Sequence, residues 1–282
     1  MAVKCKVCDS NCTTGAPIVH SSDNLILVKC PHCGFIFDWD VDISVLQGTG
    51  DVGVASGIEF YLNRVEASRI LWDKEADRIT KLIKPPGKAL DVGCGIGGFL
   101  QVIKSRGFDI YGVELNPDAI DYVRSRDLFP IYTNIQETAA LGFQFDVVTL
   151  LHTLEHVSDP RQMLREIKDV LEPNGLLVIT VPCYNRLTIL LDKLQAYTGW
   201  GLIHKGHQNY FSSSTLRVLL QREGFLTLQH PFGLFGACIQ RKTPTKIKWL
   251  SRSTIELLFI FTRVLHLLGI DVNLTMYATK VP

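Results

Sequence analysis

Four cysteines near the start of the chain are spaced for metal binding. They form two C-x2-C pairs, Cys5 with Cys8 and Cys30 with Cys33. Each pair can turn two thiolates toward one ion from the same side, and two pairs complete the tetrahedral sulfur set of structural zinc. The spacing therefore predicts a zinc site with these four ligands, and Cys12 and the two histidines of this region lie outside it. The alternative is a set of free or redox-active thiols.

A second group of residues can hold a small cationic ligand. The stretch LDVGCGIGGFL reads D-x-G-x-G-x-G, with Asp91 before Gly93, Gly95 and Gly97. Glycines let the backbone approach a ligand closely, and about 20 residues further on Glu114 can accept hydrogen bonds from two ribose hydroxyls. Dinucleotide enzymes share this glycine spacing. A carboxylate placed before the glycines favours a cationic amino acid group over a pyrophosphate.

Alternating strands and helices must position these residues. KALDV predicts a strand before the glycines, GGFLQVIK a helix after them, and DIYGVEL a strand that ends on Glu114. Together they form a Rossmann-like βαβ unit. The near-continuous apolar runs DVVTLL and LLVITV predict two further parallel strands that are buried on both faces. The pattern indicates a doubly wound sheet, whose ligand lies beyond the carboxyl ends of the strands.

Polar residues with catalytic potential follow the strand DVVTLL. His152, Glu155 and His156 lie just beyond its end and are therefore expected near the reaction. An imidazole can take a proton from a hydroxyl, an amine or an acidic carbon near neutral pH. His156 and His207 are the candidate bases, with Glu155 as a third catalytic residue. Two alternatives stay open: His156 hydrogen-bonds locally at a helix start, or His152, Glu155 and His156 hold a metal.

Several motifs in this order resemble the class I S-adenosylmethionine-dependent methyltransferases, over residues 60–232. LDVGCGIGGFL resembles their first motif and GVELNP their second, while FDVVTLLHTLEHVSDP and LEPNGLLVITVP resemble the stretches around the fourth and fifth strands. The greatest likeness is to the branch with an N-terminal four-cysteine zinc-ribbon module, often associated with glycan and natural-product clusters. That branch also has a segment like GWGLIHKGHQNYFSSSTL, in which His207 is expected on a lid over the pocket.

The resemblance implies an α/β fold with a Rossmann-like doubly wound seven-stranded sheet. The sequence adds a small N-terminal zinc ribbon and a C-terminal helical insertion, and the insertion departs from a minimal methyltransferase. It implies S-adenosylmethionine as the cofactor, with Glu114 on the ribose and Leu115 beside the adenine. Asn134 stands where the family often has an aspartate for the adenine amino group. The predicted cofactor-binding residues are Asp91, Gly93, Gly95, Gly97, Glu114, Leu115, Asn134, Ile135 and His152.

The chain divides into a zinc ribbon at 1–40, a linker and helical lead-in at 41–86, and a methyltransferase domain at 87–282. The last part contains a helical insertion at about 246–268 and a closing strand at 272–280. Arg263 interrupts the apolar stretch of the insertion, which is too short to span a bilayer. The insertion is expected to pack on the main domain, to form a homodimer or to contact a membrane surface.

Composition bounds the function. The 29 basic and 28 acidic residues nearly cancel, and the ribbon has three lysines against four aspartates, which argues against nucleic acid as a partner. The first residues lack the pattern of an export signal, so a cytoplasmic protein is expected, peripheral at the inner membrane surface if the insertion binds lipid. No N-P-P-Y follows the fourth strand, which disfavours adenine and glutamine amide nitrogens as acceptors.

The sequence therefore predicts an enzyme that methylates a small-molecule acceptor, most plausibly a sugar, a nucleotide sugar or a lipid-linked glycan intermediate. One alternative is an RNA methyltransferase that uses the zinc ribbon to bind RNA. Another is a non-catalytic binding protein that retains the fold.

Overall fold

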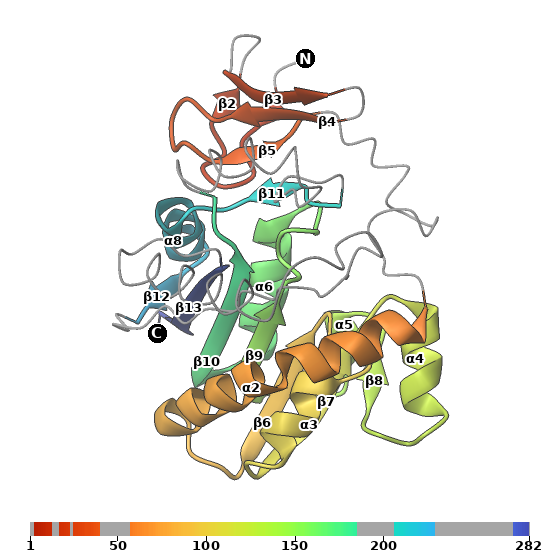
Figure 1. The fold of residues 1–282 in the computed structure, drawn as a ribbon. Coiled ribbons are helices and arrows are strands. Elements are labelled where there is room, and N and C mark those ends of the chain that lie inside the picture. Colours follow the sequence, from red (N-terminus) through yellow and green to blue (C-terminus); the bar gives the residue numbers. More distant parts are fainter. Residues whose placement is uncertain are drawn as a thin grey trace, which may run out of the picture.

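The computed structural model of the chain describes residues 3–12, 17–22, 25–39, 57–184, 206–228 and 273–281. Its main sheet has seven strands, in the order β12-β13-β10-β9-β6-β7-β8 (Figure 1). The five strands from β10 to β8 are parallel, and β13 joins β10 and β12 in antiparallel pairs. The strands are β6 (Gly87–Val92), β7 (Phe108–Val113), β8 (Ile131–Tyr132), β9 (Phe145–Leu151), β10 (Leu171–Pro182), β12 (Phe225–Thr227) and β13 (Asn273–Lys280).

Helices cover both faces of this sheet (Figure 1). They are α2 (Ile58–Leu82), α3 (Gly98–Lys104), α4 (Pro117–Arg124), α5 (Ile135–Ala140), α6 (Pro160–Val170) and α8 (Ser213–Arg222). Neighbouring strand residues point to opposite faces, so Ala89 packs in one core with α2, α3 and α4, whereas Leu90 packs in a second core with α6 and α8. The predicted doubly wound α/β fold is confirmed. The expected helix of the lead-in appears as α2, and the expected closing strand as β13.

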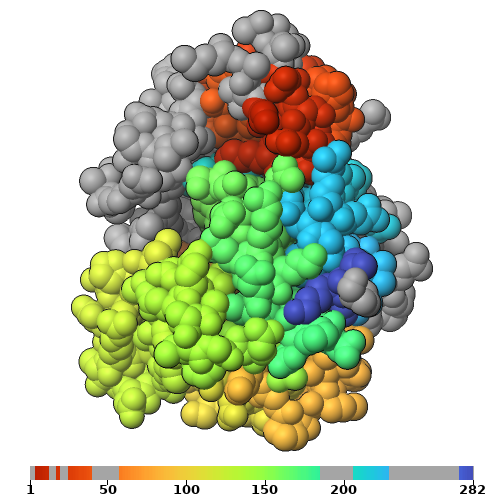
Figure 2. Space-filling view, turned by 180° about the vertical axis from the view of Figure 1, so that it is seen from behind, coloured from red at the N-terminus to blue at the C-terminus, as the bar shows by residue number. Residues whose placement is uncertain are grey.

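The N-terminal strands are β1 (Val3–Lys4), β2 (Asn11–Cys12), β3 (Ile18–Ser22), β4 (Leu25–Lys29) and β5 (Ile36–Asp38). The second cysteine pair lies between β4 and β5. One feature was not expected: β11 (Asn209–Tyr210), from the far end of the chain, joins the edge of this sheet, in the order β11-β5-β4-β3. Figure 2 shows the red N-terminal residues resting on the green and cyan parts of the main domain.

The predicted insertion at 246–268 lies outside the described residues, as does most of the segment that precedes Gly206. Among the helices that the structure does describe, none is both long enough and apolar enough to cross a membrane.

Candidate functional site

The glycine turn after β6 has a backbone that only glycine adopts easily. Gly93, Gly95 and Gly97 have φ of 79°, 55° and 80°, in the left-handed region. A Cβ on Gly95 would come within 2.7 Å of the Tyr61 ring, and one on Gly93 would overlap the Thr153 side chain. The turn therefore leaves bare peptide groups at the carboxyl end of β6, where a ligand of a doubly wound sheet is expected.

Glu114 follows β7 and faces this turn. Its Oε2 accepts a hydrogen bond from Gly95 N at 2.7 Å, while its Oε1 accepts from Leu115 N at 2.7 Å and Asn116 N at 2.9 Å. A carboxylate offers about four acceptor positions, so these three donors leave one for a ribose hydroxyl, and a second hydroxyl would take the place of a backbone donor. The bare turn and this carboxylate fit the adenosyl and methionine parts of S-adenosylmethionine.

Asp91 lies beneath the turn with 3% of its surface exposed. Its Oδ1 accepts a hydrogen bond from Thr149 Oγ1 at 2.6 Å. Burial raises the pKa of Asp91 to about 7, against the opposing effects of the Thr149 hydrogen bond and the charge of Arg64. The side chain can therefore become negative near a bound cation at neutral pH.

Asp91→Asn is expected to flatten the pH dependence of stability of the cofactor-free protein. The folded pKa of about 7 lies above the ordinary value of 3.8, so between these pH values the native state holds a proton that the unfolded state has released. Stability therefore falls as the pH rises through this window, by about 1.4 kcal/mol per unit and up to about 4 kcal/mol. Urea unfolding of both proteins from pH 5 to about 8 measures the difference. Parallel curves of unfolding free energy against pH in the two proteins would contradict the raised pKa of Asp91.

The turn after β9 brings the predicted catalytic residues together. Glu155 is 1% exposed, and its Oε1 lies 3.3 Å from His152 Nδ1 and 4.0 Å from His156 Nε2. The rings of His156 and His207 are 4.8 Å apart and inclined at 64°. Burial raises the pKa of Glu155, but the neighbouring imidazoles, His152 first, outweigh it and leave that pKa below its ordinary value.

This cluster packs directly on the glycine turn. Thr153 Oγ1 donates to Val92 O at 2.8 Å, next to Gly93. His152 itself has φ of 62°, a conformation that non-glycine residues rarely adopt.

The ligand atoms of Glu155, His156 and His207 lie within 4.8 Å of one another, so this set, rather than the one with His152, would be the metal-binding alternative. His156 Nδ1 also lies 2.6 Å from Gly206 O, so its partner is distant in sequence rather than local.

The four predicted zinc ligands converge. The Sγ atoms of Cys5 and Cys33 are 3.6 Å apart, as are those of Cys8 and Cys30, and all four lie within 4.8 Å of one another. A tetrahedral zinc with bonds of about 2.3 Å needs sulfur atoms about 3.8 Å apart. The cysteines therefore fit zinc. Cys12 is buried but is not part of this set, as predicted.

Comparison with known proteins decides the family. A family model described as "Methyltransferase domain" matches residues 66–230, more than half of the chain. The chain belongs to this family. The prediction of a class I S-adenosylmethionine-dependent methyltransferase domain is confirmed.

Relatives of this methyltransferase domain include the ubiquinone biosynthesis O-methyltransferase of Psychrobacter arcticus, 30% identical over 135 residues, which are 44% of this chain and 51% of that protein. The 2-methyl-6-phytyl-1,4-hydroquinone methyltransferase of Synechocystis is 34% identical over 104 residues, 34% of this chain and 32% of that protein. The chain spans about half the length of the first of these relatives.

Solved structures share the fold. The magnesium protoporphyrin IX methyltransferase of Synechocystis, with bound S-adenosylhomocysteine, matches with a TM-score of 0.54 and 13% identity, covering 85% of this chain and all of that one. A methyltransferase of Archaeoglobus fulgidus matches with a TM-score of 0.51 and 20% identity, over 79% of this chain and all of that one.

Two residues of the lead-in helix α2 that lie near the predicted cofactor site were not predicted. Tyr61, on α2, packs its ring against Gly95, and burial followed by the charge of Glu114 raises its pKa to about 12. Arg64 is close enough to lower the pKa of Asp91. Tyr61 and Arg64 are three residues apart and therefore share one helix face. The signal was present in the sequence, as a tyrosine and an arginine on one face of the lead-in helix.

The three residues predicted beside the adenine have different surroundings. Leu115 is 79% exposed, whereas Ile135 is 3% exposed and packs in the core. The Asn134 side chain caps α5, since its Oδ1 accepts from Glu137 N at 2.9 Å and its Nδ2 donates to Glu137 Oε1 at 2.8 Å. Asn134 would have to exchange a bond in this cap for one to an adenine.

Gly97→Ala is expected to destabilise the domain by about 2–4 kcal/mol, because it combines left-handed backbone strain with a clash. Its new Cβ would overlap the Phe129 ring in the core. Gly142→Ala is the matched control: it has φ of 70° but open space around it, so it should cost only about 1–2 kcal/mol. Equal losses in urea unfolding would show that the ring contact has no effect.

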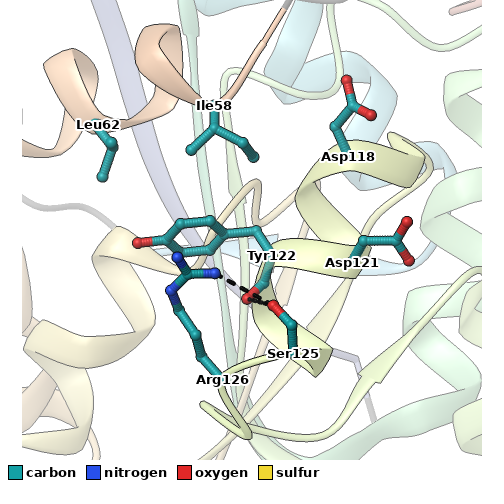
Figure 3. A pocket seen from close by; sticks show the side chains of 7 residues that line it. All are labelled: Ile58, Leu62, Asp118, Asp121, Tyr122, Ser125 and Arg126. Carbon is teal, nitrogen blue, oxygen red and sulfur yellow. Dashed lines mark hydrogen bonds between the residues drawn. The ribbon is translucent and has the colours of Figure 1, made fainter.

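A cavity of about 540 Å³ lies between α2 and α4. Figure 3 shows Ile58 and Leu62 of α2 above the Tyr122 ring, with the Arg126 guanidinium 4.0 Å from the centre of that ring. None of its lining residues belongs to the predicted cofactor or catalytic set. They are Ile58, Leu62, Asp118, Asp121, Tyr122, Ser125 and Arg126.

Proposed function

We propose that this protein transfers a methyl group from S-adenosylmethionine to a small molecule whose accepting atom carries a proton. One observation carries the proposal: Thr153 contacts the glycine turn at Val92 and Gly93, and so the cluster of Glu155 and His156 begins two residues from the cofactor crevice. A cofactor site and a proton-accepting site thus share one wall.

The chemistry divides between cofactor and protein. When bound, S-adenosylmethionine supplies a methyl group that its sulfonium has already activated. The chain aligns the acceptor, excludes water and removes its proton. His207 is 8% exposed and lies against His156, so it is shielded from bulk water and suited to act as the base. Against its burial, the imidazoles around Glu155, His152 first, hold its pKa below the ordinary value, so this buried side chain is a carboxylate.

For the acceptor we propose a sugar, a nucleotide sugar or a lipid-linked glycan intermediate. The support is the resemblance of the cysteine ribbon and the HQNYFS segment to the branch found in glycan and natural-product clusters. A phenolic acceptor is the second candidate, because the relatives include proteins named for ubiquinone and hydroquinone methylation. The near-neutral ribbon gives no support to an RNA acceptor.

Two experiments test this function in order. Calorimetry with S-adenosylhomocysteine should show one site per chain, and absence of binding would leave only the non-catalytic alternative. The protein is then incubated with methyl-labelled S-adenosylmethionine and a panel of nucleotide sugars, catechols and transfer RNA. Label in a nucleotide sugar supports the glycan proposal, whereas label only in catechols or RNA overturns it.

His207→Ala is expected to lower turnover by about 10²–10⁴-fold, the usual contribution of a general base. Its affinity for S-adenosylhomocysteine should stay nearly unchanged, because His207 lies in the acceptor part of the site. Turnover on the labelled acceptor and calorimetry on the same preparation measure both effects. Retained turnover would remove His207 from the role of base.

A further inference from the structure

The segment that carries His207 is also part of the N-terminal sheet. In β11, Asn209 pairs with Phe37 and Tyr210 pairs with Ile36, both on β5. Asp38 N donates to Gln208 O at 3.1 Å and extends the pairing by one residue. The cysteine ribbon thus holds this segment by backbone hydrogen bonds, although more than 160 residues separate the two in sequence (Figure 1).

Aromatic packing strengthens the attachment. The Phe211 ring lies 5.1 Å from the Phe35 ring, which stacks at 5.8 Å on Phe37, and all three are fully buried. Phe35 belongs to the second cysteine turn, since its carbonyl accepts from Cys30 N at 2.7 Å. A change in the ribbon is therefore transmitted to Phe211 by direct contact.

On its other side the same segment is fastened to the turn after β9. The Asn209 side chain is fully buried, and its Nδ2 donates to Leu154 O at 3.1 Å and to Val157 O at 2.6 Å. Asn209 N and Gln208 N donate to Glu155 O at 3.0 and 2.9 Å. Both Nδ2 protons are thus used, one on each side of Glu155.

A second amide completes the attachment. Gln208 Nε2 donates to His156 O at 3.0 Å. The carbonyls of residues 154–157 therefore all accept from Gln208 or Asn209. The turn has one internal backbone hydrogen bond, from His156 N to Thr153 O at 3.0 Å, and the neighbouring segment holds the four carbonyls that follow.

We infer that the cysteine ribbon supports the segment that carries His207, and that Asn209 is the positioning residue through which it fixes His207 and His156 around Glu155. The catalytic role of this arrangement rests on the proposed function, whereas the hydrogen bonds and ring contacts described above do not depend on it. Asn209 acts by donating from Nδ2. Its role is thus distinct from that of a residue that only fills the core.

Hydrogen exchange of the full chain tests the coupling. In Asn209→Ala and in Phe35→Leu, the amides of residues 206–212 are expected to exchange at least about tenfold faster than in the wild type. Asn209→Asp keeps the shape and removes the donor, so it should behave like Asn209→Ala. Tyr277→Phe is the control, because it removes a buried hydrogen bond of 2.6 Å to Glu75 on the opposite core and should leave these amides unchanged.

Histidine-labelled NMR separates positioning from packing. The imidazole signals of His156 and His207 should shift in Asn209→Ala and Asn209→Asp, but not in Tyr277→Phe. Calorimetry should show S-adenosylhomocysteine affinity within about twofold of wild type in all variants. Unchanged exchange in both Asn209→Asp and Phe35→Leu, or unchanged imidazole signals, would overturn the inference. Loss of cofactor binding in the wild type would instead refute the proposed function and leave the exchange result standing.

Discussion

Glu114→Ala is expected to weaken S-adenosylhomocysteine binding by about 100-fold or more. The Glu114 carboxylate already accepts hydrogen bonds from Gly95 N, Leu115 N and Asn116 N, which fixes it at the mouth of the crevice. A hydrogen bond to a charged group contributes about 1.5–3 kcal/mol, so losing two ribose hydroxyls costs at least about 3 kcal/mol. Each factor of ten in affinity corresponds to about 1.4 kcal/mol.

Two further variants make this result specific. Glu114→Gln keeps the shape and one acceptor oxygen, so its loss should be smaller than that of Glu114→Ala. Glu172→Ala is the matched control, because Glu172 lies at the amino end of β10 and Glu114 beyond the carboxyl end of β7. Calorimetry gives the affinities and thermal melting confirms folding. Equal affinities in the wild type and a folded Glu114→Ala would contradict the assignment.

Cys30→Ser is expected to abolish stoichiometric zinc and to unfold the N-terminal sheet. Two pairs of sulfur atoms are 3.6 Å apart and all four lie within 4.8 Å of one another, and a structural zinc contributes about 10–16 kcal/mol in isolated zinc-finger peptides. The ribbon has only a small core of its own, so zinc is expected to supply much of the free energy that orders its strands. Elemental analysis should give about one zinc per wild-type chain and much less in the variant.

Cys12→Ser provides the matched control for zinc. Cys12 is as buried as Cys30 and lies in the same module, but it is not part of the four-cysteine set. It should retain about one zinc per chain. Loss of zinc from Cys12→Ser, or full zinc in Cys30→Ser, would show that the ligand set is wrong.

Local patterns in the sequence predicted most of the fold and part of the site. The glycine turn, Glu114 and the alternation of strands and helices follow from residues that are close in the chain, because a βαβ unit is built from neighbouring segments. The convergence of four cysteines likewise follows from two short turns. Such features need no knowledge of distant contacts.

The features that were not predicted depend on contacts between residues that are far apart in the sequence. The pairing of β11 with β5 joins residues 36–37 to 209–210, and no local pattern specifies the partner of an edge strand. The same holds for Tyr61, which reaches Gly95 only because α2 packs across the turn. Asn134 illustrates the opposite problem. Its position matched a family motif, yet its side chain also caps the next helix, a competing role that asparagine often takes.

A crystal structure of the protein with S-adenosylhomocysteine would show where the cofactor binds. Both ribose hydroxyls are expected within about 3 Å of Glu114, with the amino acid part against the backbone of Gly93 and Gly95. Ligand density elsewhere, for example in the cavity between α2 and α4, with the crevice at the ends of β6 and β7 closed by side chains, would contradict this expectation.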